Sequence, residues 1–62
     1  MPVISNIPVS KVGEGDYILG TKGVTFCGRV LHVRRDGDDV VLTIEGGGVH
    51  YEPATTRVTI QR

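Results

Sequence analysis

The chain has 62 residues and is expected to form one domain, which at this size buries only about 60% of the surface that its unfolded chain exposes. Seven basic residues balance seven acidic ones, so no net field draws the protein to nucleic-acid phosphates or to anionic lipid. No stretch approaches the roughly 20 consecutive apolar residues of a membrane-spanning helix, so no membrane role is expected.

Residues 1–10 are predicted to form an N-terminal arm or an edge strand. Their valines and isoleucines are too numerous for a disordered tail, whereas Pro2 and Pro8 lack the backbone N–H group that a central strand requires. The segment has neither the basic start nor the continuous apolar run of a signal peptide. Residues 11–62 are predicted to form a single small β-barrel domain.

A turn over residues 11–16 is predicted to lead into the first core strand. Gly13 and Gly15 permit positive φ, and the Asp16 side chain is suited to accept a hydrogen bond from a nearby backbone amide. The strand is expected over residues 16–19, and residues 21–23 are expected to form a short polar loop.

Residues 24–45 predict a long β-hairpin, around which the other strands are organised. An Asp-Gly turn at residues 36–38 separates two runs that are rich in β-branched residues. On the first strand the apolar residues change face near Gly28, so that Val30 lies on one face and Val33 on the other. A change of face at a glycine predicts a bent or bulged strand.

The second strand of the hairpin has a clear period of two. Val40, Leu42 and Ile44 are predicted to face the core, whereas Val41 falls on the face assigned to solvent, as does Val49 in the following strand.

A glycine turn, a short strand, a single helical turn that begins at a proline, and a last strand complete the chain. They are predicted at residues 46–48, 49–52, 53–56 and 57–61. In the last strand Val58 and Ile60 are expected to point inward. The fold class is therefore all-β.

A resemblance to the small Src-homology-3-like barrels is carried by four segments, residues 12–18, 28–30, 36–38 and 58–60. It implies a five-stranded barrel, here with an extra N-terminal edge strand, and it marks a fold more than an activity. The chain is also similar to short actinobacteriophage-type accessory proteins of unknown role, which implies a host cytoplasm. It lacks the tryptophan and the other aromatics of the peptide-binding subtype, so recognition of proline-rich peptides is not expected.

No catalytic or metal site is expected. Cys27 is interpreted as a buried, structural side chain within a strand, and its spacing from His32 and His50 supports neither a nucleophile with its base nor a zinc site. A single cysteine forms no internal disulfide, which favours a reducing cytoplasm. The protein is thus predicted to be no enzyme and to use no cofactor or small-molecule substrate.

One cationic patch is a candidate for binding. It consists of Arg29, His32, Arg34, Arg35 and Arg57. Arginine binds carboxylate or phosphate through two parallel hydrogen bonds, so the patch is suited to an acidic protein face or to nucleic acid. The acidic residues of the paired strand and turn compete for these cations. They are Asp36, Asp38, Asp39 and Glu45.

Candidate apolar contacts are Ile4 and Ile7 in the N-terminal arm, and Val41. Together with the strand edges that a small barrel leaves open, they favour a protein-interaction module that binds a protein partner or itself, with a phage accessory or assembly role. The alternative is a small nucleic-acid-binding barrel that uses the arginine patch.

Overall fold

The computed structural model describes residues 2–20 and 26–62, which form one open, six-stranded antiparallel sheet. The all-β prediction is therefore confirmed. The strands are β1 Val3–Pro8, β2 Tyr17–Leu19, β3 Gly28–Asp36, β4 Asp39–Ile44, β5 Gly48–Pro53 and β6 Arg57–Gln61. Within the described residues the only helical element is a single 3-10 turn, η1, at Val9–Lys11.

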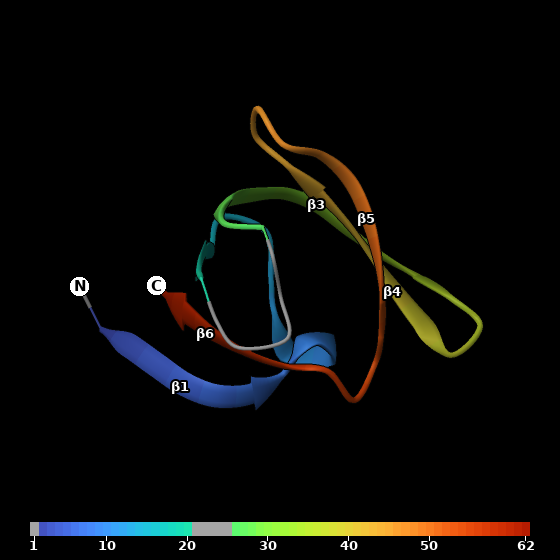
Figure 1. The fold of residues 1–62 in the computed structure, drawn as a ribbon, viewed down its shortest axis with the longest axis horizontal. Helices are drawn as coiled ribbons and strands as arrows, with labels where there is room; N and C mark the ends of the chain where they lie inside the picture. Colours follow the sequence, from blue (N-terminus) through green and yellow to red (C-terminus); the bar gives the residue numbers. More distant parts are fainter. Residues whose placement is uncertain (1, 21–25) are drawn as a thin grey trace.

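The strands lie side by side in the order β1-β6-β2-β3-β4-β5, so β1 and β5 are the two edges. The sheet curves strongly: β3 runs across from β2 to β4, and β4 and β5 stand opposite β6 in Figure 1. The two ends of the chain lie close together, because the Arg62 amide donates a 2.9 Å hydrogen bond to the Pro2 carbonyl.

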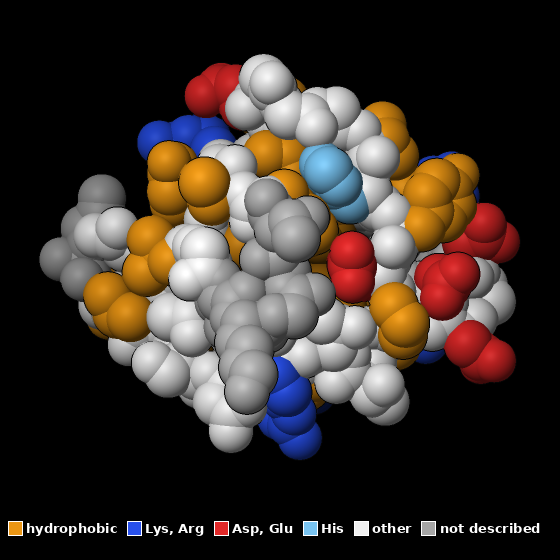
Figure 2. Space-filling model, in the orientation of Figure 1, with side chains coloured by type: hydrophobic (Ala, Val, Ile, Leu, Met, Phe, Trp, Pro, Cys, Tyr) orange, Lys and Arg blue, Asp and Glu red, His pale blue; other side chains and the backbone are white. Residues whose placement is uncertain are grey.

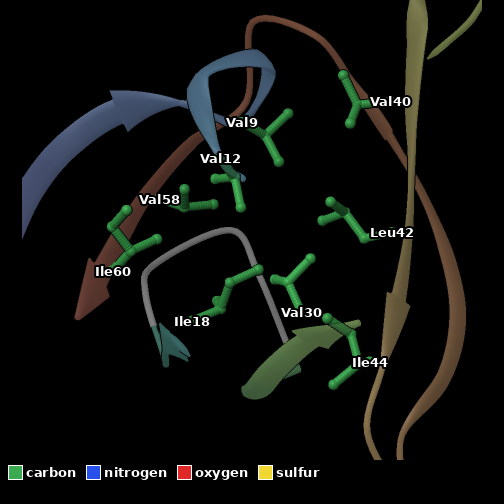
Figure 3. Packing of buried hydrophobic residues seen from close by; sticks show 9 residues of the cluster. All are labelled: Val9, Val12, Ile18, Val30, Val40, Leu42, Ile44, Val58 and Ile60. Atoms are coloured by element: carbon green, nitrogen blue, oxygen red, sulfur yellow. The ribbon is translucent and has the colours of Figure 1, made fainter. Parts of the chain in front are cut away.

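The concave side of the sheet holds the core, and its buried members among the described residues are all aliphatic (Figure 3), while the ring of Phe26 packs against them. Its buried members are Val9, Val12, Ile18, Val30, Val40, Leu42, Ile44, Val58 and Ile60. The inward direction predicted for alternate residues of β4 and β6 is therefore confirmed. Each fully buried side chain of this kind contributes about 1.5–3 kcal/mol, so the core rests on many small contributions.

The bulge in β3 lies later than the sequence indicates. The pairing with β4 shifts between Val30 and His32, so Leu31 is the extra residue and Val33 returns to the core side, opposite Leu42. The prediction that Val30 and Val33 lie on opposite faces is therefore wrong. Of the strand predicted from residue 24, positions 24 and 25 lie outside the described residues, Phe26 and Cys27 are not part of a strand, and β3 begins at Gly28.

Gly28, the first residue of β3, lies against Ile44 at the end of β4. Its φ is +141°, and a Cβ atom built there would lie 2.7 Å from Cγ2 of Ile44. Only glycine combines this backbone conformation with this contact. The Glu45 amide then donates to the Arg29 carbonyl at 2.9 Å, which holds the two strands together at the same place.

The N-terminal segment pairs with β6 as an edge strand and does not extend as a free arm. Its register with β6 shifts between Ile4 and Ile7, where Asn6 has a φ of +56°. The segment ends at Pro8, and Val9 starts η1 and is fully buried. The strand is thus shorter than the ten residues assigned to the arm.

Tight turns join the last strands, as the sequence predicts. Gly37 has a φ of +62° in the turn between β3 and β4, and the Gly47 amide donates to the Ile44 carbonyl in the glycine turn. The predicted helical turn is a single hydrogen-bonded turn, in which the Thr56 amide donates to the Pro53 carbonyl at 2.9 Å. The predicted loop at residues 21–23 lies outside the described residues.

The two glycines provide a test of this packing. Gly28→Ala is expected to lower the free energy of unfolding by about 2–5 kcal/mol, because it adds a clash with Ile44 to an unfavourable φ. Gly37→Ala is the matched control: its φ is also positive, but its Cβ would meet no atom within 4 Å, so a loss of about 1 kcal/mol is expected. Urea unfolding followed by circular dichroism measures both, and equal losses would contradict the contact.

Candidate interaction surface

The convex side of β3, β4 and β5 carries two rows of cross-strand neighbours, and we call it the outer face. One row runs from His32 across Thr43 to Val49, and the other from Arg34 across Val41 to Tyr51. The side chain of Leu31 projects from the bulge beside them and is 48% exposed. Val49 and Tyr51 are 55% and 54% exposed.

Val41 is buried, with only 2% of its surface exposed, so the prediction that it faces solvent is wrong. Alternation gives its direction correctly, but Arg34 and Tyr51 flank it on the neighbouring strands. The Arg34 guanidinium donates a long hydrogen bond of 3.5 Å to the Tyr51 hydroxyl, and this bond passes from β3 to β5 over Val41. Val41 therefore supports the outer face from below and is not itself a contact residue.

The five residues of the predicted cationic patch do not all lie on one face. Arg29, His32 and Arg34 project from the outer side of β3, whereas Arg35 lies on the opposite side, in the row with Val40. Arg57 is at the start of β6, where its guanidinium donates to the Asn6 carbonyl at 3.2 Å.

The acidic residues expected to neutralise this patch are not its partners. In the described parts of the chain, no ion pair joins Asp36, Asp38, Asp39 or Glu45 to an arginine or histidine. His32 instead lies 3.1 Å from Glu14, on the turn before β2. Figure 2 shows acidic side chains gathered at the right of the view, where the turn between β3 and β4 lies in Figure 1.

The N-terminal isoleucines also differ from their prediction as free contacts. Ile4 and Ile7 are half-buried and pack against the core, because β1 is hydrogen-bonded to β6. Val3 is the exposed apolar residue of this strand, at 56%.

Cys27 is exposed and precedes β3, so the expectation of a buried cysteine within a strand is wrong. His50 stacks on Phe26, with 4.1 Å between ring centroids, and its Nε2 lies 2.8 Å from the Gly47 carbonyl. Within residues 2–20 and 26–62, no group of three histidine, cysteine or acidic side chains is arranged to hold a metal ion, and no pocket is formed.

Asp16 and Arg62 form an ion pair that the sequence does not reveal. Asp16 is 4% exposed, and its two carboxylate oxygens accept hydrogen bonds of 3.0 Å from Nε and a terminal nitrogen of Arg62, 46 residues away. The Gly13 amide donates to the same carboxylate at 2.8 Å, as predicted for this turn. The Arg62 hydrogen bond holds the pKa of Asp16 below its ordinary value against the effect of burial, and the Gly13 amide adds to it.

In comparisons with known proteins, no family model, curated protein or solved structure matches the chain. None of the described residues belongs to a helix with the length and hydrophobicity that a membrane crossing requires.

The ion pair of Asp16 predicts how stability depends on pH. Because the pKa of Asp16 is lowered by folding, its contribution is complete above the ordinary pKa of an aspartate and is lost as the pH falls through the lowered value. Arg62→Gln is expected to make the loss of stability between neutral and acidic pH smaller. Asp16→Ala is expected to cost about 1–3 kcal/mol at neutral pH, because the Gly13 amide loses its partner.

Urea unfolding at a series of pH values measures this dependence. Arg57→Gln is the matched control, since Arg57 donates to a carbonyl and has no carboxylate partner in the described structure. An unchanged acid dependence in Arg62→Gln would show that the ion pair does not act in solution.

Proposed function

We propose that the protein is a non-enzymatic protein-interaction module that binds its partner through the outer face. The observation that carries this proposal is the exposure of three large apolar side chains on the outer face, Leu31 on β3 and Val49 and Tyr51 on β5, with β4 between them. Tyrosine and arginine are enriched in protein interfaces, and Tyr51 and Arg34 contact each other on this surface.

The order of the outer face supports the same proposal. Arg34 and Tyr51 are joined by a hydrogen bond over the buried Val41, so both side chains are partly fixed before a partner arrives. A fixed side chain loses less conformational entropy on binding, which favours affinity. The core side of the same strands is filled by the protein's own residues, so the outer face is the side left for a partner.

We further propose that the sheet is a variant of the Src-homology-3-like barrel with β1 added as a sixth strand. The pairing of β2 supports this proposal, because this first core strand is hydrogen-bonded to β3 on one side and to the last strand, β6, on the other. A phage accessory role in a host cytoplasm belongs to the same proposal, and the free, exposed Cys27 is consistent with a reducing compartment. The genes beside this one in its genome test the accessory role.

A single charge on the outer face tests the proposed binding surface. Leu31→Asp is expected to reduce capture of the partner from a native lysate by at least about tenfold, because a carboxylate must then be desolvated in the interface. Val3→Asp, an equally exposed site on the distant strand β1, is expected to leave capture unchanged. Capture that is equal for the wild type and both variants would contradict the outer face as the binding surface.

A nucleic-acid-binding function is the second candidate, and one observation favours it. Tyr17, 41% exposed, lies opposite Arg29, and Tyr51 lies beside Arg34, so two exposed aromatic rings each have a neighbouring arginine. Exposed aromatic rings and cations together bind single-stranded nucleic acid by stacking and by phosphate contacts. The neutral net charge and the contact of Glu14 with His32 act against it.

Salt dependence distinguishes the two candidates. Binding of a single-stranded oligonucleotide would weaken by about 0.7 log units per log unit of salt for each phosphate contacted. Arg29→Ala and Arg34→Ala would each reduce this slope, whereas Arg35→Ala, on the other side of the sheet, would not. Absence of binding at low salt by fluorescence anisotropy would eliminate this candidate.

A further inference from the structure

The two edges of the sheet differ in their capacity to accept another strand. The β1 edge is interrupted by the register shift between Ile4 and Ile7, with Asn6 at positive φ, and it is bounded by Pro2 and Pro8. Prolines and bulges are the features that prevent an edge strand from pairing with another chain. Strand addition is therefore disfavoured at β1.

The β5 edge has no bulge, and its one proline, Pro53, is the last residue of the strand. β5 pairs with β4 without a shift over its whole length, from Gly48 opposite Ile44 to Pro53 opposite Asp39. Among the described elements no strand pairs with its other side. Backbone N–H and C=O groups on that side have no strand partner, and an added strand would satisfy them.

The side chains of β5 restrict which strand fits. Val49 and Tyr51 lie on the outer face, and His50 and Glu52 lie on the inner side, in rows with Leu42 and Val40. In an antiparallel pair, residues opposite each other point to the same face. A second β5 can therefore pair with the first only in registers that bring outer residues opposite outer residues.

Two such registers use most of the strand, and the backbone of Gly48 separates them. With Tyr51 on the two-fold axis, residues 49–53 of each copy lie opposite one another, and none of these residues has a positive φ. With His50 on the axis, Gly48 must pair with Glu52 of the second copy, but the φ of Gly48 is +82°. Because a strand needs a negative φ, the register centred on Tyr51 is favoured.

We propose that β5 pairs antiparallel with β5 of a second copy of this chain, with Tyr51 opposite Tyr51 at the two-fold axis. The inference rests on the proposed function, because Val49 and Tyr51 belong to both surfaces. The net charge of zero removes long-range repulsion between copies, and a domain of 62 residues gains stability from such association. The sheets of the two copies would then be continuous across the edge.

Cysteine cross-linking tests the register. In a Cys27→Ser background, Tyr51→Cys places two thiols opposite each other, where Cβ atoms are about 5 Å apart. Val49→Cys is the matched control, with the same exposure, because in this register the two thiols would be four residues apart, about 13 Å. Mild oxidation, or a short bis-maleimide, is expected to link Tyr51→Cys into dimers and to leave Val49→Cys monomeric.

Equal linking of both variants, preferential linking of Val49→Cys, or no linking of either would overturn the proposal. A second measurement needs no cross-link. Tyr51→Lys places two ammonium groups at the axis and is expected to raise the dimer dissociation constant at least about tenfold by light scattering. Tyr17→Lys, the same change at an exposed tyrosine away from the edge, is expected to leave it unchanged.

The result separates this inference from the proposed function. A wild-type protein that stays monomeric at high concentration, and whose partner capture is lost in Leu31→Asp, overturns pairing through β5 and retains the outer face. A dimer with the predicted cross-link supports pairing through β5, even where capture does not depend on Leu31.

Discussion

The close contact between Gly28 and Ile44 is the constraint on which the sheet depends. The chain has one phenylalanine and no tryptophan, so few large rings can fill the space between facing parts of the sheet. The sheet must therefore curve tightly over small aliphatic side chains. The missing Cβ at Gly28 lets β3 approach the end of β4 closely enough for this curvature. The buried valines, isoleucines and leucine from facing strands of the curved sheet then meet in one core.

The bulge at Leu31 accompanies the same curvature and determines which side chains of β3 lie on the outer face. One extra residue in β3 keeps Val30 and Val33 on the core side and turns Leu31 outward, next to His32. Leu31 is therefore exposed on the side of the sheet that also carries Val49 and Tyr51, with β4 between them. The outer face is a consequence of how the core is closed.

The ends of the chain are fixed by polar contacts. Arg62 binds the buried carboxylate of Asp16 through its side chain and the Pro2 carbonyl through its amide, so three distant segments meet at one residue. The Asp16 carbonyl also accepts from the Val30 amide at 2.8 Å, which links this cluster to β3. The opposite end of the sheet, at β5, has no comparable closure among the described elements, and there the edge remains open.

The sequence by itself determined the all-β class, the turn at Gly37, the inward residues of β4 and β6, and the hydrogen bond from a backbone amide to the Asp16 side chain. These features depend on period-two alternation and on local turn chemistry. The sequence did not locate the bulge. Each side of an extra residue keeps its own period-two alternation, so the pattern does not show which residue is the extra one. Only the tertiary structure decided that Val41 is covered, that Arg29 and Arg35 lie on different sides, and that Arg62 reaches Asp16. Each of these outcomes depends on contacts with residues of other strands, and local sequence patterns do not predict where those residues lie.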